Sequence, residues 1–127
     1  MSAKPRILVV DDEPQLTRVL LRSLTSKGYD VHIASDGEVG LQTFRDWTPS
    51  LVITDLAMPN ISGLELMKIA KSRYPGLSVI VMTMMDTPYH RKAALTAGAD
   101  AFVAKSTMDT DLVPTIANLQ HAPAERH

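Results

Sequence analysis

The sequence contains no cysteine, and aromatic residues make up only 5% of its 127 positions. Without cysteine the chain can form no disulfide, bind no metal through thiolates and use no cysteine nucleophile. The absence fits a reducing compartment. A disulfide-stabilised secreted fold and a cysteine-based zinc site are therefore excluded from the outset.

Long apolar runs and a strong charge of either sign are also missing. The first apolar run, 7–10, is far too short for a signal peptide or a membrane span. The formal net charge is only −1, so the chain has no overall basic field that could hold nucleic acid or an anionic membrane. We therefore expect a cytoplasmic protein that binds neither nucleic acid nor membranes directly.

What the sequence does contain is a regular alternation of strand and helix patterns. Its length suits one domain with a single core, and no internal repeat or low-complexity segment interrupts it. Short runs of β-branched and other apolar residues predict buried strands at 7–10, 31–33, 51–54, 78–82 and 101–104. Amphipathic patterns after these runs predict helices, for example at 38–47 and 88–97.

Pro114 complicates the last predicted helix, which carries Leu112, Ile116 and Leu119 at helical spacing. A start at Asp109 would place the proline inside the helix, where it removes a hydrogen bond at a cost of about 3 kcal/mol. We therefore expect either a later start, which puts Pro114 in the first turn, or a kink.

Strands that alternate with helices predict an α/β fold with a doubly wound, five-stranded parallel sheet flanked by five helices. We adopt the strand order 2-1-3-4-5 from flavodoxin-like proteins, because the sequence alone does not determine it. In this order the first and third strands are neighbours. Their carboxyl ends open into the crevice where folds of this kind bind ligands.

Polar side chains stand at the ends of four of the predicted strands. Asp11 and Asp12 follow the first strand, Asp55 the third, Thr83 the fourth and Lys105 the fifth. By itself Asp55 could equally begin a turn, which is a common use of aspartate. Because the carboxyl ends of parallel strands lie at one edge of a sheet, however, all five side chains should meet there. Their convergence favours a functional site.

The chemistry of these side chains points to phosphoryl groups. Three carboxylates in one cleft repel one another and need protons or a cation. Oxygen ligands without histidine or cysteine favour Mg²⁺, which keeps waters for an incoming phosphate. Lys105 would add a positive charge and Thr83 a hydroxyl donor for a tetrahedral anion at Asp55. The pattern predicts phosphoryl chemistry on a carboxylate nucleophile.

Over residues 5–120 the chain resembles the receiver domain of two-component response regulators. The segments that carry the resemblance are Ile7-Leu-Val-Val-Asp-Asp-Glu13, Asp55 with Met58-Pro59 and Gly63, Val79-Ile-Val-Met-Thr83, and Ala97-Gly-Ala-Asp-Ala-Phe-Val-Ala-Lys105. Each segment is weak alone, but their order and spacing make the combination specific. We expect a receiver domain at 5–120 and a flexible C-terminal tail at 121–127, in a chain that either acts alone or was cut from a longer regulator.

The resemblance implies a phosphorylation site. Asp55 would accept a phosphoryl group from a phosphohistidine on a sensor histidine kinase or phosphotransfer protein, or from a small donor such as acetyl phosphate. Asp11 or Asp12, Asp55 and the backbone carbonyl of Ala57 would hold Mg²⁺, with Mn²⁺ as a possible substitute. In the family the second acid of the pair, here Asp12, usually binds the metal more directly.

The resemblance also implies a switch. Thr83 and Lys105 would contact the phosphoryl oxygens, and Thr83 would act together with Phe102, whose ring would turn inward. This movement would change the face formed by helix 4, strand 5 and helix 5, where an output domain, a downstream protein or a second copy of the chain would bind. Phe102 could equally be an ordinary core residue, because aromatic residues in strands usually pack.

Four positions depart from the family pattern. Ser106 follows the lysine where the family often has proline in a cis bond, and we expect a trans bond because a non-proline cis bond costs about 2.5–4 kcal/mol. Met84 replaces a small residue and should narrow access to Asp55. Ala57 and Met85 offer no side-chain hydrogen bond to an attacking water, which predicts slow loss of the phosphoryl group.

We therefore expect a phosphorylation-dependent signalling switch that promotes its own phosphorylation and dephosphorylation, not a conventional enzyme. Two alternatives are open. A metal-dependent phosphohydrolase would need a second acid at position 57, which is alanine. A non-phosphorylated pseudo-receiver would have no need of the complete set Asp12, Asp55, Thr83 and Lys105.

Overall fold

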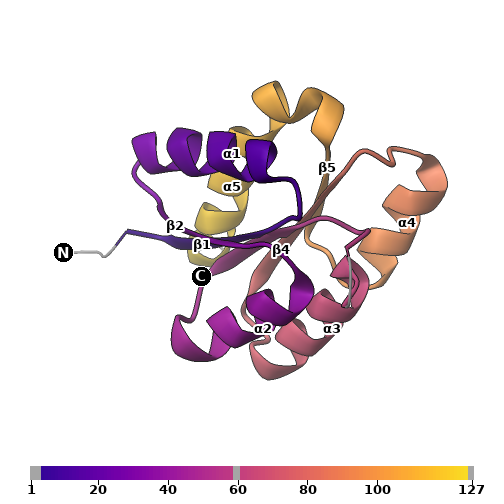
Figure 1. The fold of residues 1–127 in the computed structure, drawn as a ribbon, viewed down its shortest axis with the longest axis horizontal. Helices are drawn as coiled ribbons and strands as arrows, with labels where there is room; N and C mark the ends of the chain where they lie inside the picture. The colour runs from indigo at the N-terminus through magenta and orange to yellow at the C-terminus, as the bar shows by residue number, and fades with distance from the viewer. Residues whose placement is uncertain (1–3, 59–60, 126–127) are drawn as a thin grey trace.

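The computed structural model describes residues 4–58 and 61–125, and it has a central parallel sheet (Figure 1). The strands are β1 (Arg6–Val10), β2 (Asp30–Ala34), β3 (Leu51–Thr54), β4 (Ser78–Thr83) and β5 (Ala101–Ala104). Their order is β2-β1-β3-β4-β5, and every neighbouring pair is parallel. The predicted fold class and strand order are confirmed.

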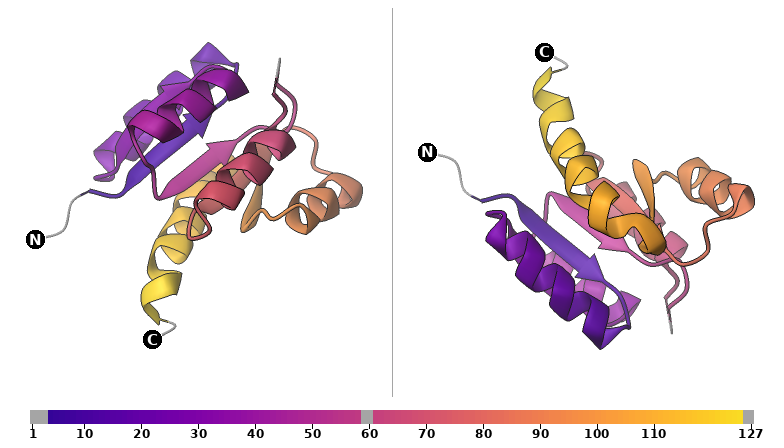
Figure 2. Two further views of the ribbon diagram at one scale, coloured as in Figure 1. Left: turned by 90° about the horizontal axis from the view of Figure 1, so that it is seen from below. Right: turned by 90° about the horizontal axis from the view of Figure 1, so that it is seen from above.

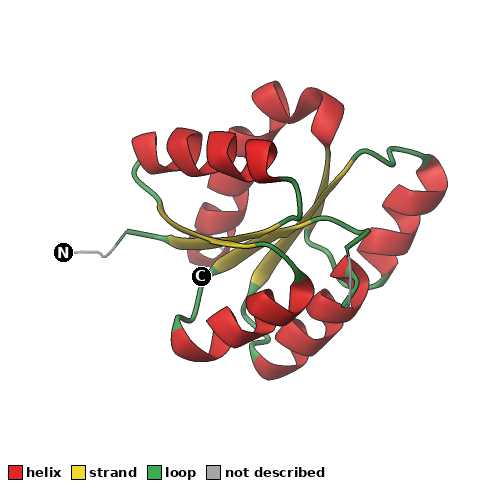
Figure 3. Ribbon diagram, viewed as in Figure 1, coloured by secondary structure: helices red, strands yellow, loops and turns green. Residues whose placement is uncertain are grey.

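Helices cover both faces of this sheet. They are α1 (Pro14–Ser26), α2 (Gly37–Asp46), α3 (Gly63–Arg73), α4 (Pro88–Thr96) and α5 (Met108–Glu125), and a short 3-10 turn, η1 (Lys105–Thr107), precedes the last (Figure 3). Helices α1 and α5 lie on one face, whereas α2, α3 and α4 lie on the other (Figures 1 and 2). This is the doubly wound arrangement.

The two faces of the sheet each bury a separate half of the core. On β1, Leu8 and Val10 pack toward α2, α3 and α4, whereas Ile7 and Val9 pack toward α1 and α5. Successive side chains of a strand point to opposite faces, so a strand that is covered on both sides must be apolar throughout. This requirement explains the uninterrupted apolar runs of the sequence.

Local signals in the sequence set several helix ends. Asp36, Ser62 and Thr87 cap α2, α3 and α4 with side-chain oxygens that accept hydrogen bonds from amides in the first turn. Thr87 is followed by Pro88 at the first helical position, a pair of residues typical of a helix start. Gly28 follows α1 with φ at +96°, a conformation that glycine adopts most easily.

The last helix corrects one expectation. Helix α5 begins at Met108, so Pro114 lies in its interior and the predicted late start is wrong. The proline nitrogen cannot donate to the carbonyl of Thr110. The helix continues to Glu125, whereas residues 126–127 lie outside the described part of the chain. The flexibility expected of 121–127 stays a prediction.

Three further points bear on the sequence expectations. No peptide bond among the described residues is cis, so the bond between Lys105 and Ser106 is trans as expected. Pro59, which belongs to the motif after Asp55, lies outside the described residues. None of the described helices combines the length and the apolar character needed to cross a bilayer.

Candidate functional site

The register of the sheet brings the ends of the first and third strands together. Val10 lies opposite Thr54 in the β1–β3 pair, so the aspartates that follow these residues are neighbours. The amide of Asp55 donates a hydrogen bond to the carbonyl of Val10 at 3.2 Å. The amide of Asp11 in turn donates a hydrogen bond to the carbonyl of Ala34 in β2. The structure therefore confirms the prediction that the acidic ends of the first and third strands lie next to each other.

Lys105 crosses this edge of the sheet and joins three carboxylates. Its Nζ atom lies 2.8 Å from Asp55 Oδ2, 2.9 Å from Asp11 Oδ2 and 2.7 Å from Glu13 Oε1. The lysine side chain is only 5% exposed, and the side chains of Asp11 and Asp55 are 1% and 11% exposed. A single buried ammonium therefore neutralises part of a concentrated negative charge.

The surroundings of Lys105 keep it protonated. Burial alone would lower the pKa of this amine, because it disfavours the charged form. The hydrogen bonds to Asp55, Glu13 and Asp11 more than offset that effect, and they hold the pKa above its usual value of 10.5. The ammonium is thus a fixed positive charge at Asp55.

Asp11 is almost completely buried, and its surroundings act on its charge in opposite directions. Burial raises the pKa of its carboxyl group, although the neighbouring Lys105 ammonium and the hydrogen bond from the Glu13 amide act in the opposite direction. Its Oδ1 accepts from that amide at 3.0 Å. Its Oδ2 is fully buried and faces Lys105, but makes no hydrogen bond of good geometry.

Asp11, Asp12 and Asp55 form a group that fits a divalent metal ion. Each can offer a carboxylate oxygen, and these three atoms lie within 4.8 Å of one another. Asp12 is exposed, whereas the other two are buried. The buried Oδ2 of Asp11 has the Lys105 ammonium as an ionic partner but makes no hydrogen bond of good geometry, and oxygen donors alone suit a hard cation. The donor set therefore matches the metal chemistry expected from the sequence.

The backbone around Asp55 holds its carboxylate in one orientation. Oδ1 accepts hydrogen bonds from the amides of Leu56 at 2.7 Å and Ala57 at 3.4 Å, which leaves Oδ2 for Lys105. The amide of Gly63, at the start of α3, donates to the carbonyl of Leu56 at 3.0 Å. A Cβ atom at position 63 would overlap the carbonyl oxygen of Asp55, so only glycine fits.

Thr83 stands at the end of β4, opposite Ala104, and is buried. Its Oγ1 accepts a hydrogen bond from the amide of Met85 at 3.1 Å. The next side chain, Met84, is 71% exposed. The positions expected to tune access and phosphoryl lifetime are all exposed, and their roles stay predictions: Ala57, Met84 and Met85.

Phe102 lies on β5, apart from the charged cluster. Its ring is half-buried and packs against the core beneath α2, α3 and α4. The guanidinium of Arg91 lies over the ring, 4.6 Å from its centroid. The role of Phe102 as a switch residue stays a prediction.

Sequence reasoning missed two contacts of this region. Glu13 was not among the predicted site residues, but it binds Lys105; its place as the third acid of the run 11–13 was the available clue. The stacking of Arg91 on Phe102 was not foreseen either.

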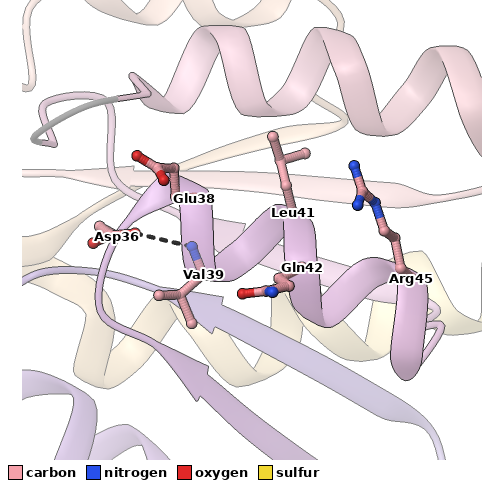
Figure 4. Close-up of a pocket in the computed structure, with 6 residues that line it drawn as sticks. All are labelled: Asp36, Glu38, Val39, Leu41, Gln42 and Arg45. Atoms are coloured by element: carbon pink, nitrogen blue, oxygen red, sulfur yellow. Dashed lines mark hydrogen bonds between the residues drawn. The ribbon is translucent and has the colours of Figure 1, made fainter.

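A hollow of about 380 Å³ on α2, lined by Asp36, Glu38, Val39, Leu41, Gln42 and Arg45, shares no residue with the charged cluster (Figure 4).

The family of the chain follows from comparison with known proteins. Residues 7–117 match the response regulator receiver domain, and the chain belongs to this family. It is accordingly a phospho-accepting receiver of two-component signalling.

Two curated relatives come from mycobacteria. The probable transcriptional regulatory protein TcrX of Mycobacterium tuberculosis is 37% identical over 99 residues, which are 78% of this chain and 42% of TcrX. The response regulator MprA of Mycolicibacterium vanbaalenii is 39% identical over 100 residues, which are 79% of this chain and 43% of MprA. The chain thus matches less than half the length of these relatives.

Solved structures support the fold over nearly the whole chain. A CheY-like receiver domain from Methanospirillum hungatei superposes with a TM-score of 0.87 at 30% identity, covering 96% of this chain and 98% of that one. The response regulator TrrA of Thermotoga maritima, in complex with Mg²⁺ and BeF, gives a TM-score of 0.82 at 34% identity and covers 91% and 98% of the two chains.

Proposed function

We propose that Asp55 is the phosphoryl acceptor of this receiver. The observation that carries the assignment is the contact between Asp55 Oδ2 and the buried ammonium of Lys105, beside Asp11 at the carboxyl edge of the sheet. A carboxylate in this position is nucleophilic, oriented by backbone amides, and next to a fixed positive charge that an incoming phosphoryl group needs.

The proposed reaction transfers one phosphoryl group. A carboxylate oxygen of Asp55 attacks phosphorus and forms an acyl phosphate, 4-aspartylphosphate. The bond from phosphorus to the imidazole nitrogen of a kinase or phosphotransfer protein breaks, or the bond to the acetate oxygen of acetyl phosphate, and the leaving group takes the electron pair. Lys105 neutralises charge on the transferred group, and the Thr83 hydroxyl donates a hydrogen bond to one of its oxygens.

Asp11, Asp12 and Asp55 would hold Mg²⁺, or Mn²⁺ in its place, together with the backbone carbonyl of Ala57. When bound, the ion would neutralise charge on the phosphoryl oxygens. The close approach of the three carboxylate oxygens supports this proposal, as does Asp11 Oδ2, which makes no hydrogen bond of good geometry. The complex of the related TrrA with Mg²⁺ and BeF supports it as well.

The proposed output is a change of the face formed by α4, β5 and α5. Movement of Thr83 toward the phosphoryl group and rotation of Phe102 would alter this face for an output domain, a downstream protein or a second copy of the chain. A relative named as a probable transcriptional regulatory protein supports an output domain that acts in transcription. The small net charge of −1 supports a receiver that binds no nucleic acid itself. Cytoplasmic localisation stays a prediction.

Intact-mass measurement after incubation with Mg²⁺ and acetyl phosphate tests the proposal. We expect a stable adduct of one HPO₃ unit on the wild-type chain, none on Asp55→Asn, and a greatly slowed gain on Asp12→Asn. Steady turnover of a phosphoester without an adduct would instead indicate a phosphohydrolase. An unchanged mass with every donor, including a phosphorylated histidine protein, would indicate a pseudo-receiver.

A further inference from the structure

The two residues assigned to the switch are connected through one loop. Thr83 accepts its hydrogen bond from the amide of Met85 at 3.1 Å. The next residue, Asp86, accepts a hydrogen bond from the guanidinium of Arg91 at 2.9 Å. That guanidinium lies over the ring of Phe102 at 4.6 Å. A continuous series of contacts therefore runs from the Thr83 hydroxyl to the Phe102 ring.

The strength of these contacts suits a reversible device. The side chains of Arg91 and Asp86 are 48% and 43% exposed, and ion pairs at such positions are weak. A cation over an aromatic face at an exposed site is also a weak interaction. Two weak contacts can bias the position of a half-buried ring without locking it, as a two-state element requires.

We propose that Arg91 is a positioning residue that, held by Asp86, keeps Phe102 in its unphosphorylated position. This inference rests on the proposed function, because it takes Asp55 as the acceptor. When Thr83 turns toward phosphorylated Asp55, its oxygen leaves the Met85 amide, and the loop that carries Asp86 is free to move. Arg91 then loses its partner, and the ring of Phe102 is released.

The sequence provides a favourable probe, because it contains only two phenylalanines. Protein labelled with 4-fluorophenylalanine gives one ¹⁹F resonance for Phe102 and one for Phe44, which is 3% exposed in the core and reports whether the fold is intact. Spectra would be recorded for wild type, Arg91→Ala and Asp86→Asn, before and after addition of Mg²⁺ and acetyl phosphate. Lys92→Ala, which removes the neighbouring exposed cation on α4, is the matched control.

In the unphosphorylated state we expect the Phe102 resonance of both variants to move toward its position in phosphorylated wild type, while Phe44 stays in place. Asp86→Asn is the decisive variant, since it leaves the arginine next to the ring. Phosphoryl uptake should be about two- to tenfold faster in both variants, the factor that corresponds to one or two weak contacts. Lys92→Ala should match wild type in both measurements.

An unmoved Phe102 resonance in Asp86→Asn, or an equal shift in Lys92→Ala, would overturn the inference. Intact masses of the same samples keep the two proposals apart. If wild type gains no phosphoryl group, the proposed function fails. The positioning role is then judged from the unphosphorylated spectra alone, where a shift in both variants supports it and no shift in Asp86→Asn refutes it.

Discussion

Lys105 is the residue on which the charge balance of the site depends. It is the partner of Asp11, Glu13 and Asp55, and two of these carboxylates are buried. Removing one member of a buried ionic group leaves uncompensated charge, which costs far more than the net contribution of the intact group. The stability of the metal-free protein should therefore depend on this side chain and on its protonation.

Lys105→Met should lower the free energy of unfolding by about 3–5 kcal/mol at neutral pH. The raised pKa of Lys105 means that the folded chain holds this proton more tightly than the unfolded chain, where the value is 10.5. The contribution of Lys105 to the free energy of unfolding is thus complete below pH 10.5 and is lost as the pH rises through the pKa of Lys105 in the folded chain. Urea denaturation with a chelator at several pH values measures this contribution.

Lys92→Met, at an exposed position on α4, is the control for this series and should change stability little. A difference between wild type and Lys105→Met that stays constant into strong alkali would contradict the explanation.

Two exposed residues at the mouth of the site should set the phosphoryl lifetime. Neither Ala57 nor Met85 can position a water molecule through its side chain. Ala57→Asn and Met85→Glu each supply a hydrogen-bonding group, and each should speed loss of the phosphoryl group by about two- to tenfold, the effect of one hydrogen bond. The decay of the intact-mass adduct after removal of the donor gives the rate. Loss from wild type within seconds, or no effect of either substitution, would count against this role.

At the scale of elements, the start of α3 and the end of β3 are packed too closely for any side chain at position 63. Gly63→Ala should destabilise the protein by about 1–3 kcal/mol or more, because its Cβ would overlap the backbone of Asp55. It should also slow phosphorylation, since Asp55, the proposed acceptor, has to move. Gly76→Ala is the matched control, because nothing lies within 4 Å of a Cβ there. Equal unfolding midpoints of the two variants would show that the packing can relax.

The elements that the sequence predicted well are those whose formation has a single physical cause. The strands are apolar because both faces are covered, and the cap at Thr87 is a local hydrogen bond. Helix α5 was harder, because tertiary packing of Leu112 and Ile116 outweighs the local penalty of Pro114. Packing of this kind depends on distant segments, which a local pattern does not contain.

The same distinction applies to the site. Main-chain topology alone brings Asp11, Asp55 and Lys105 to one edge, so their meeting was predictable. Which side chains then touch depends on rotamers and on loop paths. The contact of Glu13 with Lys105 joins residues 92 positions apart, and that of Arg91 with Phe102 joins a helix to a strand. No spacing rule in the sequence encodes such contacts.

The whole molecule should become more stable when the acidic group binds a cation. A ligand that binds only the folded state stabilises it by about 2.7 kcal/mol at a concentration 100 times its dissociation constant. Millimolar Mg²⁺ should therefore raise the melting temperature of the wild-type chain above that in sodium chloride of equal ionic strength. Asp12→Asn removes an exposed ligand and should lose most of this gain. An equal rise of the melting temperature in wild type and Asp12→Asn would show that the ion binds outside the acidic group.

The long sequence separation between Asp55 and Lys105 has a consequence for the protein during its synthesis on the ribosome. Asp55 and Lys105 lie 50 positions apart, and at synthesis rates of about 5–20 residues per second Asp55 leaves the ribosome roughly 3–10 s before the lysine. During that interval the nascent chain carries the carboxylate of the proposed acceptor without its ammonium partner. The chain becomes able to receive a signal only once its last strand has joined the sheet.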